Sequence, residues 1–457
     1  MYKTALILAA GDGKRMKSDL PKVLHKVCGY PLVKHVFNAV KCVSDDEPII
    51  ITGRCGELTR EIFGENARYA EQTERRGTAH AVMCGKHFLQ GKDGYVTVTA
   101  GDMPLLRGET FEKMVNTAVE NDMAACVLTA VVDDSFGYGR IIRDENGNVK
   151  AIVEQRDASE EEQKIREINT SVYCFKIDRL LDALLRINDN NAQGELYLTD
   201  VLGILYNDGC RVGACVVDDN TEAMGINDRV QLSLAEKQMQ KRINEKVMLG
   251  GVTLIDPDTT YIEAGVVIGR DSVVYPGNVL SGQTVIGENC VLFSNSRIDN
   301  SNIGDKTEVQ CSVILSSTVG TNAHVGPNAY IRPDSVIGDN TRIGDFVEIK
   351  KSTIGNGTKV SHLTYVGDAE VGEDCNMGCG TVFVNYDGKN KHKTVVGDHV
   401  FIGCNANLVA PVKIGDNALI AAGSTVTEDV EENDMCIARA RQTNKKGWVL
   451  NYKNWKR

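Results

Sequence analysis

A short cationic loop near the start of the chain combines residue types that bind phosphate. Gly11, Asp12 and Gly13 follow a run of small apolar residues, and the next nine positions carry four cations, Lys14, Arg15, Lys17 and Lys22. A glycine-bearing loop can bring its backbone N–H groups close to a phosphate, while the cations neutralise its charge. The loop lacks the third glycine of a dinucleotide fingerprint and the Gly-Lys-Ser/Thr of a P-loop, so alone it is a weak signal.

A carboxylate follows a predicted strand in the same half of the chain. Gly101 and Asp102 come directly after the apolar run Tyr95–Thr99. Ligands of open α/β sheets bind at the carboxyl ends of strands, where a carboxylate can hold a hard divalent cation. A simple turn residue is the alternative interpretation of Asp102.

A histidine in the second half could act as a base. His362 lies in Ser361–Tyr365, where a six-residue repeat slips, and the polar, basic segment Asn385–Lys391 interrupts the same repeat. Histidine can accept a proton from an amine near neutral pH. A loop extruded from a repeat is a common place for binding groups, although an exposed corner residue remains the alternative for His362.

The repeat itself predicts the fold of the second half. From about residue 262 to 430 an aliphatic residue followed by glycine recurs, from Ile268-Gly269 to Ile414-Gly415, with many gaps of 6, 12 or 18 residues. This period fits neither a helix nor an open sheet, and it is typical of a parallel β-helix of hexapeptides. Three hexapeptides make one coil, so we expect about ten coils that are stable only as a stack.

The first half predicts an α/β domain with a mostly parallel sheet. Helical patterns such as Leu32–Val43 alternate with continuous apolar runs, Thr4–Ala10, Pro48–Thr52, Tyr95–Thr99 and Ala125–Val132. Such runs are typical of strands covered on both faces. We expect this domain over residues 1–227, one connecting helix over residues 228–249, and the β-helix with a C-terminal tail over residues 250–457.

Composition limits the classes of partner. The chain has 457 residues, a formal net charge of −11 and 42% hydrophobic residues, which allows two or three domains with full cores. The acidic balance argues against nucleic acid or an anionic membrane as a general partner. The 14 scattered cysteines and the lack of a membrane-spanning run predict reduced, mostly buried thiols in a cytoplasmic protein.

The N-terminal motif resembles that of the sugar-phosphate nucleotidyltransferases. The motif runs Leu8-Ala9-Ala10-Gly11-Asp12-Gly13-Lys14-Arg15-Met16, followed by Pro21-Lys22, and that family usually has threonine at the position of Lys14. The motif Ser361–Tyr365 and the hexapeptides extend the resemblance over essentially the whole chain. The chain as a whole is similar to the bacterial bifunctional N-acetylglucosamine-1-phosphate uridyltransferases that are also glucosamine-1-phosphate N-acetyltransferases.

This resemblance implies an overall architecture and activity. We expect a Rossmann-like nucleotidyltransferase domain, the connecting helix and a left-handed coil. The reactions would consume glucosamine 1-phosphate, acetyl-CoA and UTP, use Mg²⁺, and supply UDP-N-acetylglucosamine for cell-wall synthesis. The expected assembly is a homotrimer, with the acetyltransferase site shared between chains.

For uridylyl transfer, the resemblance assigns Mg²⁺ to Asp102 and Asn227 and the phosphates to Arg15 and Lys22. N-capping of the predicted helix remains the alternative for Asn227. The remaining contacts to uridine and sugar are Leu8, Ala9, Ala10, Gly11, Gln72, Gly77, Thr78, Gly139, Glu154, Asn169 and Asn227. Lys14 would add one more cation beside the phosphates.

For acetyl transfer, the resemblance makes His362 the base. The residues implied to bind the sugar phosphate are Arg332, Lys350, Tyr365, Asn376 and Lys391. Those on the acetyl-CoA side are Cys379, Asn385, Tyr386, Cys404, Ala422 and Arg439. Cys379 replaces the usual alanine and Cys404 the frequent serine, so we expect acetyl transfer to be unusually sensitive to thiol reagents.

Two other function classes compete with this interpretation. One is a pyrophosphorylase whose coil serves only assembly, and the other is a non-catalytic regulatory subunit with a degenerate nucleotidyltransferase fold. The presence of His362, Arg332 and Lys350 argues against the first. The presence of Arg15, Lys22 and Asp102 argues against the second.

Overall fold

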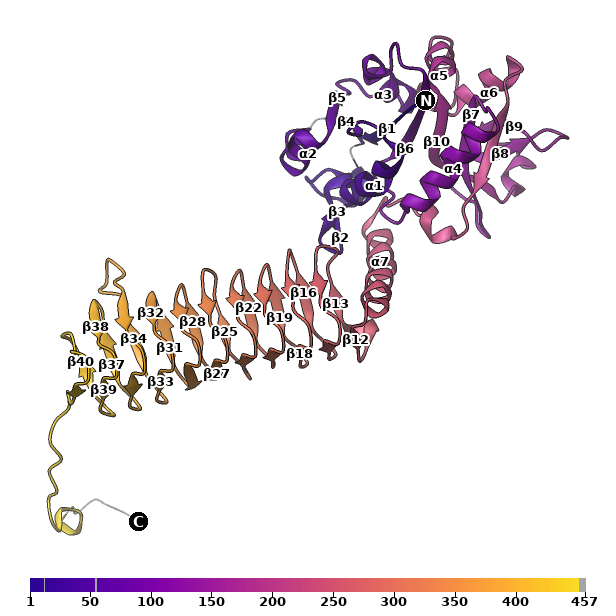
Figure 1. Ribbon diagram of the computed structural model, residues 1–457. Coiled ribbons are helices and arrows are strands. Elements are labelled where there is room, and N and C mark those ends of the chain that lie inside the picture. Colours follow the sequence, from indigo (N-terminus) through magenta and orange to yellow (C-terminus); the bar gives the residue numbers. More distant parts are fainter. Residues whose placement is uncertain (12, 54–55, 452–457) are drawn as a thin grey trace. The chain divides into compact units, whose positions relative to one another are not determined.

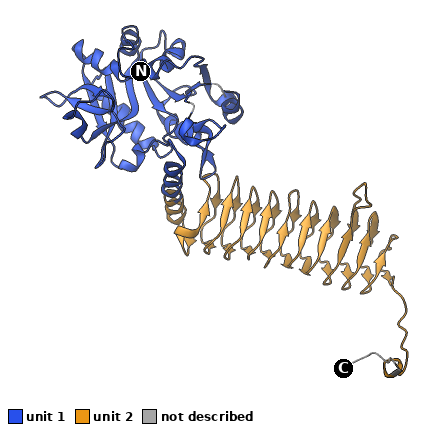
Figure 2. Ribbon diagram, turned by 180° about the vertical axis from the view of Figure 1, so that it is seen from behind, with its two compact units in different colours: residues 1–240 blue, residues 241–457 orange. Residues whose placement is uncertain are grey.

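A computed structural model describes residues 1–11, 13–53 and 56–451. The chain divides into two compact units, Met1–Gln240 and Lys241–Arg457 (Figures 1 and 2). We describe each unit by itself.

The first unit is built on one sheet with the strand order β11-β7-β10-β6-β1-β4-β5. The strands are β1 (Tyr2–Ala9), β4 (Ile49–Thr52), β5 (Arg68–Glu71), β6 (Gly94–Ala100), β7 (Ala125–Val131), β10 (Glu167–Lys176) and β11 (Val212–Val216). Neighbours pair in parallel except at β10, which is antiparallel to both β6 and β7. The mostly parallel sheet is therefore confirmed, with one reversed strand inside it.

Helices cover both faces of this sheet (Figure 1). They are α1 (Leu32–Val40), α2 (Gly56–Phe63), α3 (Thr78–Cys84), α4 (Gly108–Glu120), α5 (Ile177–Leu184) and α6 (Asp200–Asn207). Side chains of α1 and α4 share one apolar core with Ala5 and Ile7 of β1, while those of α3, α5 and α6 share another with Leu6. Alternate residues of β1 thus point into different cores, which explains its continuous apolar sequence.

Two small hairpins complete the first unit. One is formed by β2 (Lys26–Val27) and β3 (Tyr30–Pro31), and the other by β8 (Arg140–Arg143) and β9 (Val149–Val153). Strand β8 also pairs with β10 through Arg140 and Ile168.

The boundary between the two units, after Gln240, falls inside helix α7 (Arg229–Leu249). The Asp228 carboxylate accepts the backbone N–H groups of Val230 and Gln231, each at 2.9 Å, so Asp228 and not Asn227 is the N-cap. The helix is followed by Gly250 and by Gly251 with φ of +92°, a backbone conformation that glycine adopts without strain.

The second unit is a parallel β-helix with three sheets of eleven, ten and nine strands (Figure 1). The eleven-stranded sheet contains β12 (Thr253–Leu254), β15 (Val273–Val274), β18 (Val291–Leu292), β21 (Glu308–Val309), β24 (His324–Val325), β27 (Arg342–Asp345), β30 (Lys359–His362), β33 (Asn376–Met377), β36 (Phe401–Ile402), β39 (Leu419–Ile420) and β41 (Met435–Cys436). The ten-stranded sheet contains β13 (Tyr261–Ile262), β16 (Val279–Ser281), β19 (Arg297–Asp299), β22 (Val313–Leu315), β25 (Tyr330–Ile331), β28 (Glu348–Lys350), β31 (Tyr365–Gly367), β34 (Val382–Val384), β37 (Asn407–Val409) and β40 (Thr425–Val426). The nine-stranded sheet contains β14 (Val267–Ile268), β17 (Val285–Ile286), β20 (Asn302–Ile303), β23 (Thr318–Val319), β26 (Val336–Ile337), β29 (Thr353–Ile354), β32 (Ala369–Val371), β35 (Thr394–Val396) and β38 (Val412–Ile414).

The core of the β-helix is a stack of aliphatic side chains. In the ten-stranded sheet, Ile298, Ile314, Ile331, Ile349 and Val366 lie in register on consecutive coils, and all are fully buried. Each coil thus covers the apolar side chain of its neighbour, which no coil could do alone.

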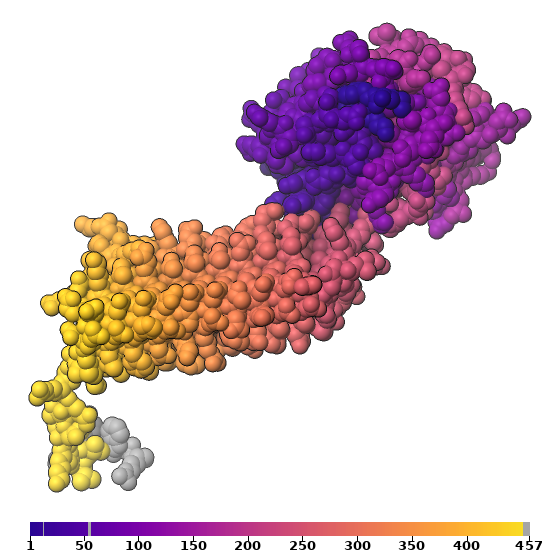
Figure 3. Space-filling model, in the orientation of Figure 1, coloured from indigo at the N-terminus to yellow at the C-terminus, as the bar shows by residue number. Residues whose placement is uncertain are grey.

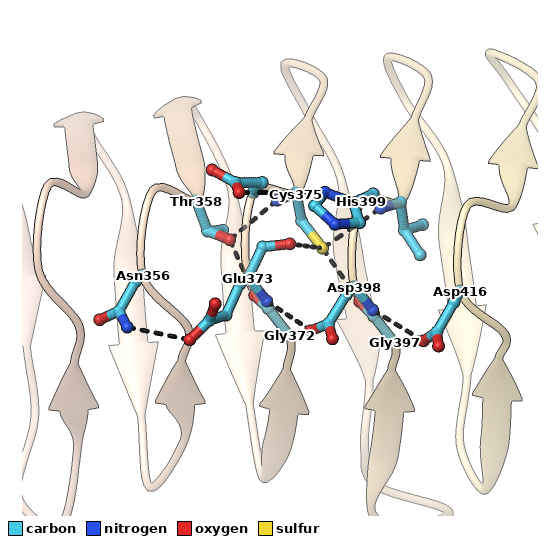
Figure 4. A network of polar contacts seen from close by, with 11 residues as sticks. Asn356, Thr358, Gly372, Glu373, Cys375, Gly397, Asp398, His399 and Asp416 are labelled. Atoms are coloured by element: carbon cyan, nitrogen blue, oxygen red, sulfur yellow. Dashed lines mark hydrogen bonds and ion pairs between the residues drawn. The ribbon is translucent and has the colours of Figure 1, made fainter.

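Polar side chains join the coils at one corner (Figure 4). The Asp398 carboxylate accepts the backbone N–H of Glu373 at 2.8 Å, and the Asp416 carboxylate accepts that of Asp398 at 2.9 Å. A Cβ atom at Gly372 would overlap the Asp398 carboxylate. The glycine of the repeat therefore leaves room for the bond that links one coil to the next.

Two features of the second unit lie outside the coil core. Tyr386 and Lys391 pair as an isolated antiparallel bridge, so the segment between them forms a small hairpin, which Figure 3 shows as a protrusion from the unit's surface. In the part of the tail that the structure describes, residues 439–450 are exposed, and Trp448–Asn451 forms a 3-10 turn. Within the described ranges, no helix has the length and apolar character needed to cross a bilayer.

All thirteen described cysteines are free, and six of them are buried. The expectation that most of the cysteines are buried is therefore wrong for these residues. Several corner positions of the β-helix, such as Cys311 and Cys404, expose the side chain.

Ile298→Ala tests the aliphatic stack. Ile298 is fully buried, so its truncation should leave a cavity and lower the free energy of unfolding by about 2–5 kcal/mol. The measurement is urea denaturation followed by circular dichroism. Arg297→Ala on the same strand points to solvent and should change the free energy by less than about 0.5 kcal/mol. Equal effects of the two substitutions would contradict the packing argument.

Candidate active sites

Four polar side chains of the first unit converge at the end of β6. The Lys22 ammonium forms a short ion pair with Asp102 and donates to Asn227 Oδ1 at 3.2 Å. Arg15 donates to the same Asn227 oxygen at 2.7 Å. The structure therefore brings together the residues that the sequence assigned to metal and phosphate binding.

Backbone contacts hold this cluster. Ile226 N–H donates to the Asp102 carbonyl at 3.0 Å, which sets Asn227 beside Asp102. Gly13 has φ of +62°, and a Cβ atom there would overlap the Lys22 side chain. The loop glycine thus permits the close approach of Lys22.

The donor set of this cluster fits a hard divalent cation. Asp102 Oδ2 and Asn227 Oδ1 both contact one ammonium, so two oxygens already face a single positive charge. Mg²⁺ is commonly held by one or two protein oxygens plus substrate phosphates. Among the described residues, no group of three or more histidines, cysteines or carboxylates could form a larger metal site.

A cavity of about 460 Å³ adjoins the glycine loop. Its lining includes the predicted residues Ala9, Ala10 and Gly11, together with Lys14. Thr59 and Arg75 also line it and were not anticipated, because neither belongs to a motif. A lone arginine in a loop carries no spacing signal that could have identified it.

A second cavity, of about 230 Å³, gathers the other predicted contacts of the first unit. Leu8, Thr78, Glu154 and Asn169 all line it. The Gln72 side chain donates to the Gly77 carbonyl at 3.0 Å, and Gly77 directly precedes Thr78, so these two predicted residues lie next to the cavity lining.

Gly139 lies where the second cavity needs a small residue. Asn169 N–H donates to the Gly139 carbonyl at 2.9 Å, and a Cβ atom at Gly139 would be 3.3 Å from Glu154 Oε1. Burial raises the pKa of Glu154, with repulsion from Asp157 and Asp200 adding to the effect. Glu154 is thus a carboxylate held in a poorly solvated place.

Sequence reasoning missed one wall of the second cavity. This wall consists of Gln193, Glu195, Tyr197, Leu198 and Thr199. The wall is fixed by Leu198 N–H, which donates to the Thr78 hydroxyl at 3.0 Å. The segment has the composition of a loop, so only its contact with Thr78 across 120 residues reveals its role.

In the second unit, three predicted cations gather beside the ten-stranded sheet. Arg332 pairs with Glu348 at 2.9 Å and its guanidinium lies 5.8 Å from the Tyr330 ring centroid, so it reaches back over the ten-stranded sheet. Hydrogen bonding to Lys350 and repulsion from its charge lower the pKa of Lys391, and Arg332 adds to this repulsion. Like charges at this proximity create a ready site for an anion.

Asp368 organises the same cluster and was not predicted. Its Oδ2 atom accepts from Lys350 at 3.4 Å and from the Asn385 amide at 2.5 Å. The same amide lies 3.3 Å from the Tyr365 hydroxyl. Asp368 therefore joins the predicted residues Lys350, Asn385 and Tyr365. It lies at a corner of the coil with φ of +50°, and its sequence context indicates a corner residue and nothing more.

His362 lies at another corner of the coil, where β30 of the eleven-stranded sheet ends and before β31 of the ten-stranded sheet begins. The His362 carbonyl accepts the backbone N–H of Gly380 at 3.4 Å. On the next coils, the Cys379 carbonyl accepts the N–H of Asn405, and the Cys404 carbonyl accepts the N–H of Gly423, each at 2.8 Å. His362, Cys379, Cys404 and Ala422 are thus stacked on four consecutive coils. A Cβ atom at Gly423 would be 3.9 Å from Arg439 Cδ, which brings this predicted residue to the same column.

The remaining predicted residues flank this column. Asn376 begins β33, the strand that leads into the Cys379 corner. Tyr386 lies in the projecting hairpin, is 56% exposed and donates to the Gly388 carbonyl at 2.8 Å. Asn385, expected on the acetyl-CoA side, thus lies in the cation cluster, whereas Asn376, expected to bind the sugar phosphate, lies on the strand that leads to the column.

Known domain families match both units. The MobA-like NTP transferase domain matches residues 5–169, and the bacterial transferase hexapeptide (six repeats) matches residues 393–428. The GMPPB C-terminal domain matches residues 316–402. These matches confirm the nucleotidyltransferase domain and the left-handed parallel β-helix expected from the sequence.

Individual proteins match over almost the whole chain. A bifunctional protein GlmU of Clostridium beijerinckii and one of Clostridium acetobutylicum are each 56% identical over 450 residues, which is 98% of both chains compared. The bifunctional protein GlmU of Caldanaerobacter subterraneus is 56% identical over 97% of both chains. A solved structure of UDP-glucose pyrophosphorylase complexed with UDP-glucose covers 53% of this chain, and all of its own, at 19% identity and a TM-score of 0.44, too low to add to the argument. At this level of identity and coverage, the chain belongs to the GlmU family of bifunctional proteins.

Proposed function

We propose that the protein makes UDP-N-acetylglucosamine in two steps at two separate sites. Acetyl-CoA acetylates glucosamine 1-phosphate at the β-helix, and UTP then uridylylates the product at the α/β domain, releasing pyrophosphate. The observation that carries the proposal is the pair of cationic clusters, one at Lys22 and one at Lys350, in a chain of net charge −11. Such a product serves cell-wall synthesis in the cytoplasm.

In uridylyl transfer, an oxygen of the sugar 1-phosphate attacks the α-phosphorus of UTP and pyrophosphate leaves. Positioning and charge neutralisation supply most of the catalysis in such reactions. Arg15 and Lys22 bind the phosphates, and the Leu8–Gly11 backbone with Gln72 and Thr78 holds the uridine. Asp102 and Asn227 would hold Mg²⁺, which supplies further positive charge when bound.

The sugar of the uridylyl acceptor lies in the smaller cavity of the first unit. Glu154 and Asn169 line that cavity and offer a carboxylate and an amide to sugar hydroxyls. Gly139 leaves the space that a side chain would fill beside Glu154. A partly buried carboxylate binds a hydroxyl strongly, because few waters compete for it.

In acetyl transfer, the amine of glucosamine 1-phosphate attacks the thioester carbonyl of acetyl-CoA. His362 takes the proton of the amine, and the coenzyme leaves as its thiol. The His362 side chain is exposed, and no side chain in the described ranges forms a hydrogen bond with its ring. Arg332, Lys350 and Lys391 hold the phosphate of the sugar beside it.

We further propose a homotrimer in which β-helices pack side by side. Phe401, Leu419 and Met435 are in register on consecutive coils of the eleven-stranded sheet, and each is at least 36% exposed. A contiguous exposed apolar strip of this kind is typical of a protein interface. The strip adjoins the column of His362 and Cys404, so the neighbouring chain completes the acetyl-CoA site.

Separate substitutions should divide the two reactions. Asp102→Asn removes a charged oxygen from the metal site and should lower pyrophosphate release by about a hundredfold or more, with acetyl transfer unchanged. His362→Ala should lower thiol release from acetyl-CoA by about a hundredfold or more, with uridylyl transfer unchanged. Thiol release is measured with glucosamine 1-phosphate and acetyl-CoA, and pyrophosphate release is measured separately with N-acetylglucosamine 1-phosphate, UTP and Mg²⁺, so that neither assay depends on the other reaction. Loss of both reactions in either variant would contradict two independent sites.

Glu154→Gln tests the buried carboxylate of the sugar cavity. Because burial raises the folded-state pKa of Glu154, the folded protein binds this proton more tightly than the unfolded chain does. Stability therefore falls as pH rises from the unfolded value of 4.5 through the raised pKa. The variant should resist urea better than the parent at pH 7 but not below pH 4, and its KM for N-acetylglucosamine 1-phosphate should rise about tenfold.

The exposed Glu160 is the matched control for Glu154. Glu160→Gln should change neither the urea midpoint at pH 7 nor the KM for the sugar phosphate. A Glu154→Gln variant that behaves like this control would contradict the assignment of Glu154 to sugar binding.

Leu419→Glu tests the proposed interface. A charge in the centre of the apolar strip should convert the trimer to smaller species in sedimentation and lower acetyl transfer, while uridylyl transfer persists. Val267→Glu places the same charge on an exposed residue of a different sheet and should leave the assembly intact. A trimer that survives Leu419→Glu would show that copies pack through another face.

A further inference from the structure

Two thiols occupy equivalent positions on neighbouring coils. Cys379 lies between Gly378 and Gly380, and Cys404 lies between Gly403 and Asn405. Gly380 has φ of +77° and Asn405 has φ of +55°, so the two corners have the same left-handed bend. Matching corners give the two cysteines parallel Cα–Cβ bonds.

The distance between these cysteines is set by the pitch of the coil. Asn405 N–H donates to the Cys379 carbonyl at 2.8 Å, and a Cβ atom at Gly378 would be 2.8 Å from Cys404 Cα. Parallel strands lie about 4.8 Å apart, which falls within the Cα separation of about 4.4–6.8 Å found for disulfides. Parallel Cα–Cβ bonds keep the Cβ atoms about 4.8 Å apart, slightly beyond the roughly 3.5–4.5 Å of disulfides, so the two corners need to draw together by only a few tenths of an ångström.

Accessibility distinguishes this pair from Cys126 and Cys174, which also lie close together. Cys126 and Cys174 face each other across β7 and β10, but both are completely buried. Burial raises the pKa of Cys126 to about 12, so it stays a protonated, shielded thiol. Cys404 is exposed and Cys379 half-buried, so the corner pair is open to solvent, whereas Cys126 and Cys174 are not.

We propose that Cys379 and Cys404 form a vicinal dithiol that oxidation closes to an intrachain disulfide, switching off acetyl transfer but not uridylyl transfer. The inference rests on the proposed acetyltransferase function of the β-helix. His362 stands on the coil directly before Cys379 in the same column. A bond between the next two coils would pull this corner out of place and fill the edge where acetyl-CoA binds.

The oxidation is balanced with a diazene such as diamide. One thiolate adds to the N=N bond, the second thiolate displaces the resulting hydrazide from sulfur, and the S–S bond forms. The two thiols lose two electrons and two protons, and the diazene becomes a hydrazine. A dithiol reductant reverses the step by thiol–disulfide exchange.

The test treats the full-length protein with diamide and measures the cysteine linkage, cross-linking between chains and the rates of the two reactions. Peptide mapping without reduction should find Cys379 linked to Cys404, and non-reducing electrophoresis should show no cross-linked chains. Acetyl transfer should fall at least about tenfold and return with dithiothreitol, while uridylyl transfer stays within about twofold, because a displaced catalytic corner loses alignment. Acetyl-CoA added beforehand should slow the loss.

Single substitutions supply the controls. In Cys379→Ser and in Cys404→Ser, the ratio of acetyl transfer after and before diamide should stay near one, whatever the starting rate. Cys311 is another exposed cysteine at a corner of the coil, and residues 326–329 of the next coil include no cysteine. Cys311→Ser should therefore keep both the parent rate and the parent sensitivity.

Three results would overturn the proposal. They are the absence of the Cys379–Cys404 peptide, a disulfide between chains in its place, and full acetyl transfer by the oxidised protein. A reduced protein without acetyl transfer would instead overturn the proposed function, and the mapped peptide would still report whether the disulfide forms.

Discussion

The sites depend on holding cations close together in an acidic chain. Each unit does so by giving its cations shared oxygen partners. In the first unit the Lys22 ammonium lies between Asp102 and Asn227, and Arg15 contacts the same amide oxygen. In the second unit, Asp368 accepts a hydrogen bond from Lys350, and Lys350 lies close enough to Lys391 to lower the pKa of Lys391. Such clusters are stable without substrate, and a polyanion can take over the partners' role when it binds.

The two folds create these clusters in different ways. In the α/β domain, the carboxyl end of β6 supplies Asp102, and the turn before α7 supplies Asn227 from a distant part of the sequence. In the β-helix, equivalent residues of consecutive coils pair in register: Lys350 pairs with Gly367, so Asp368 lies beside Lys350 because of the repeat. A sheet edge gathers unrelated segments, whereas a coil gathers equivalent ones.

Much of this arrangement could be predicted, and the failures have physical reasons. The hexapeptide period determined the coil because its aliphatic positions must stack. Strand β10 could not be recognised as reversed, because a strand buried on both faces has the same apolar composition in either direction. Among the site residues, those in motifs were placed together, whereas Asp368 and the wall from Gln193 to Thr199 act through contacts that spacing does not reveal.

The projecting hairpin shows why a coil can carry a binding loop without losing its core. The column positions Cys379 and Cys404 are 25 residues apart instead of about 18, yet Val382 still pairs with Asn407 and Thr394 with Val412. The extra residues leave the coil after Asn385, and His392 N–H donates back to the Asn385 carbonyl at 2.8 Å, which closes the base of the loop. Because the insertion begins and ends at one corner, the inward-facing residues stay in register. Lys391 and Tyr386 can therefore stand beside the cation cluster, while the stack below them stays intact.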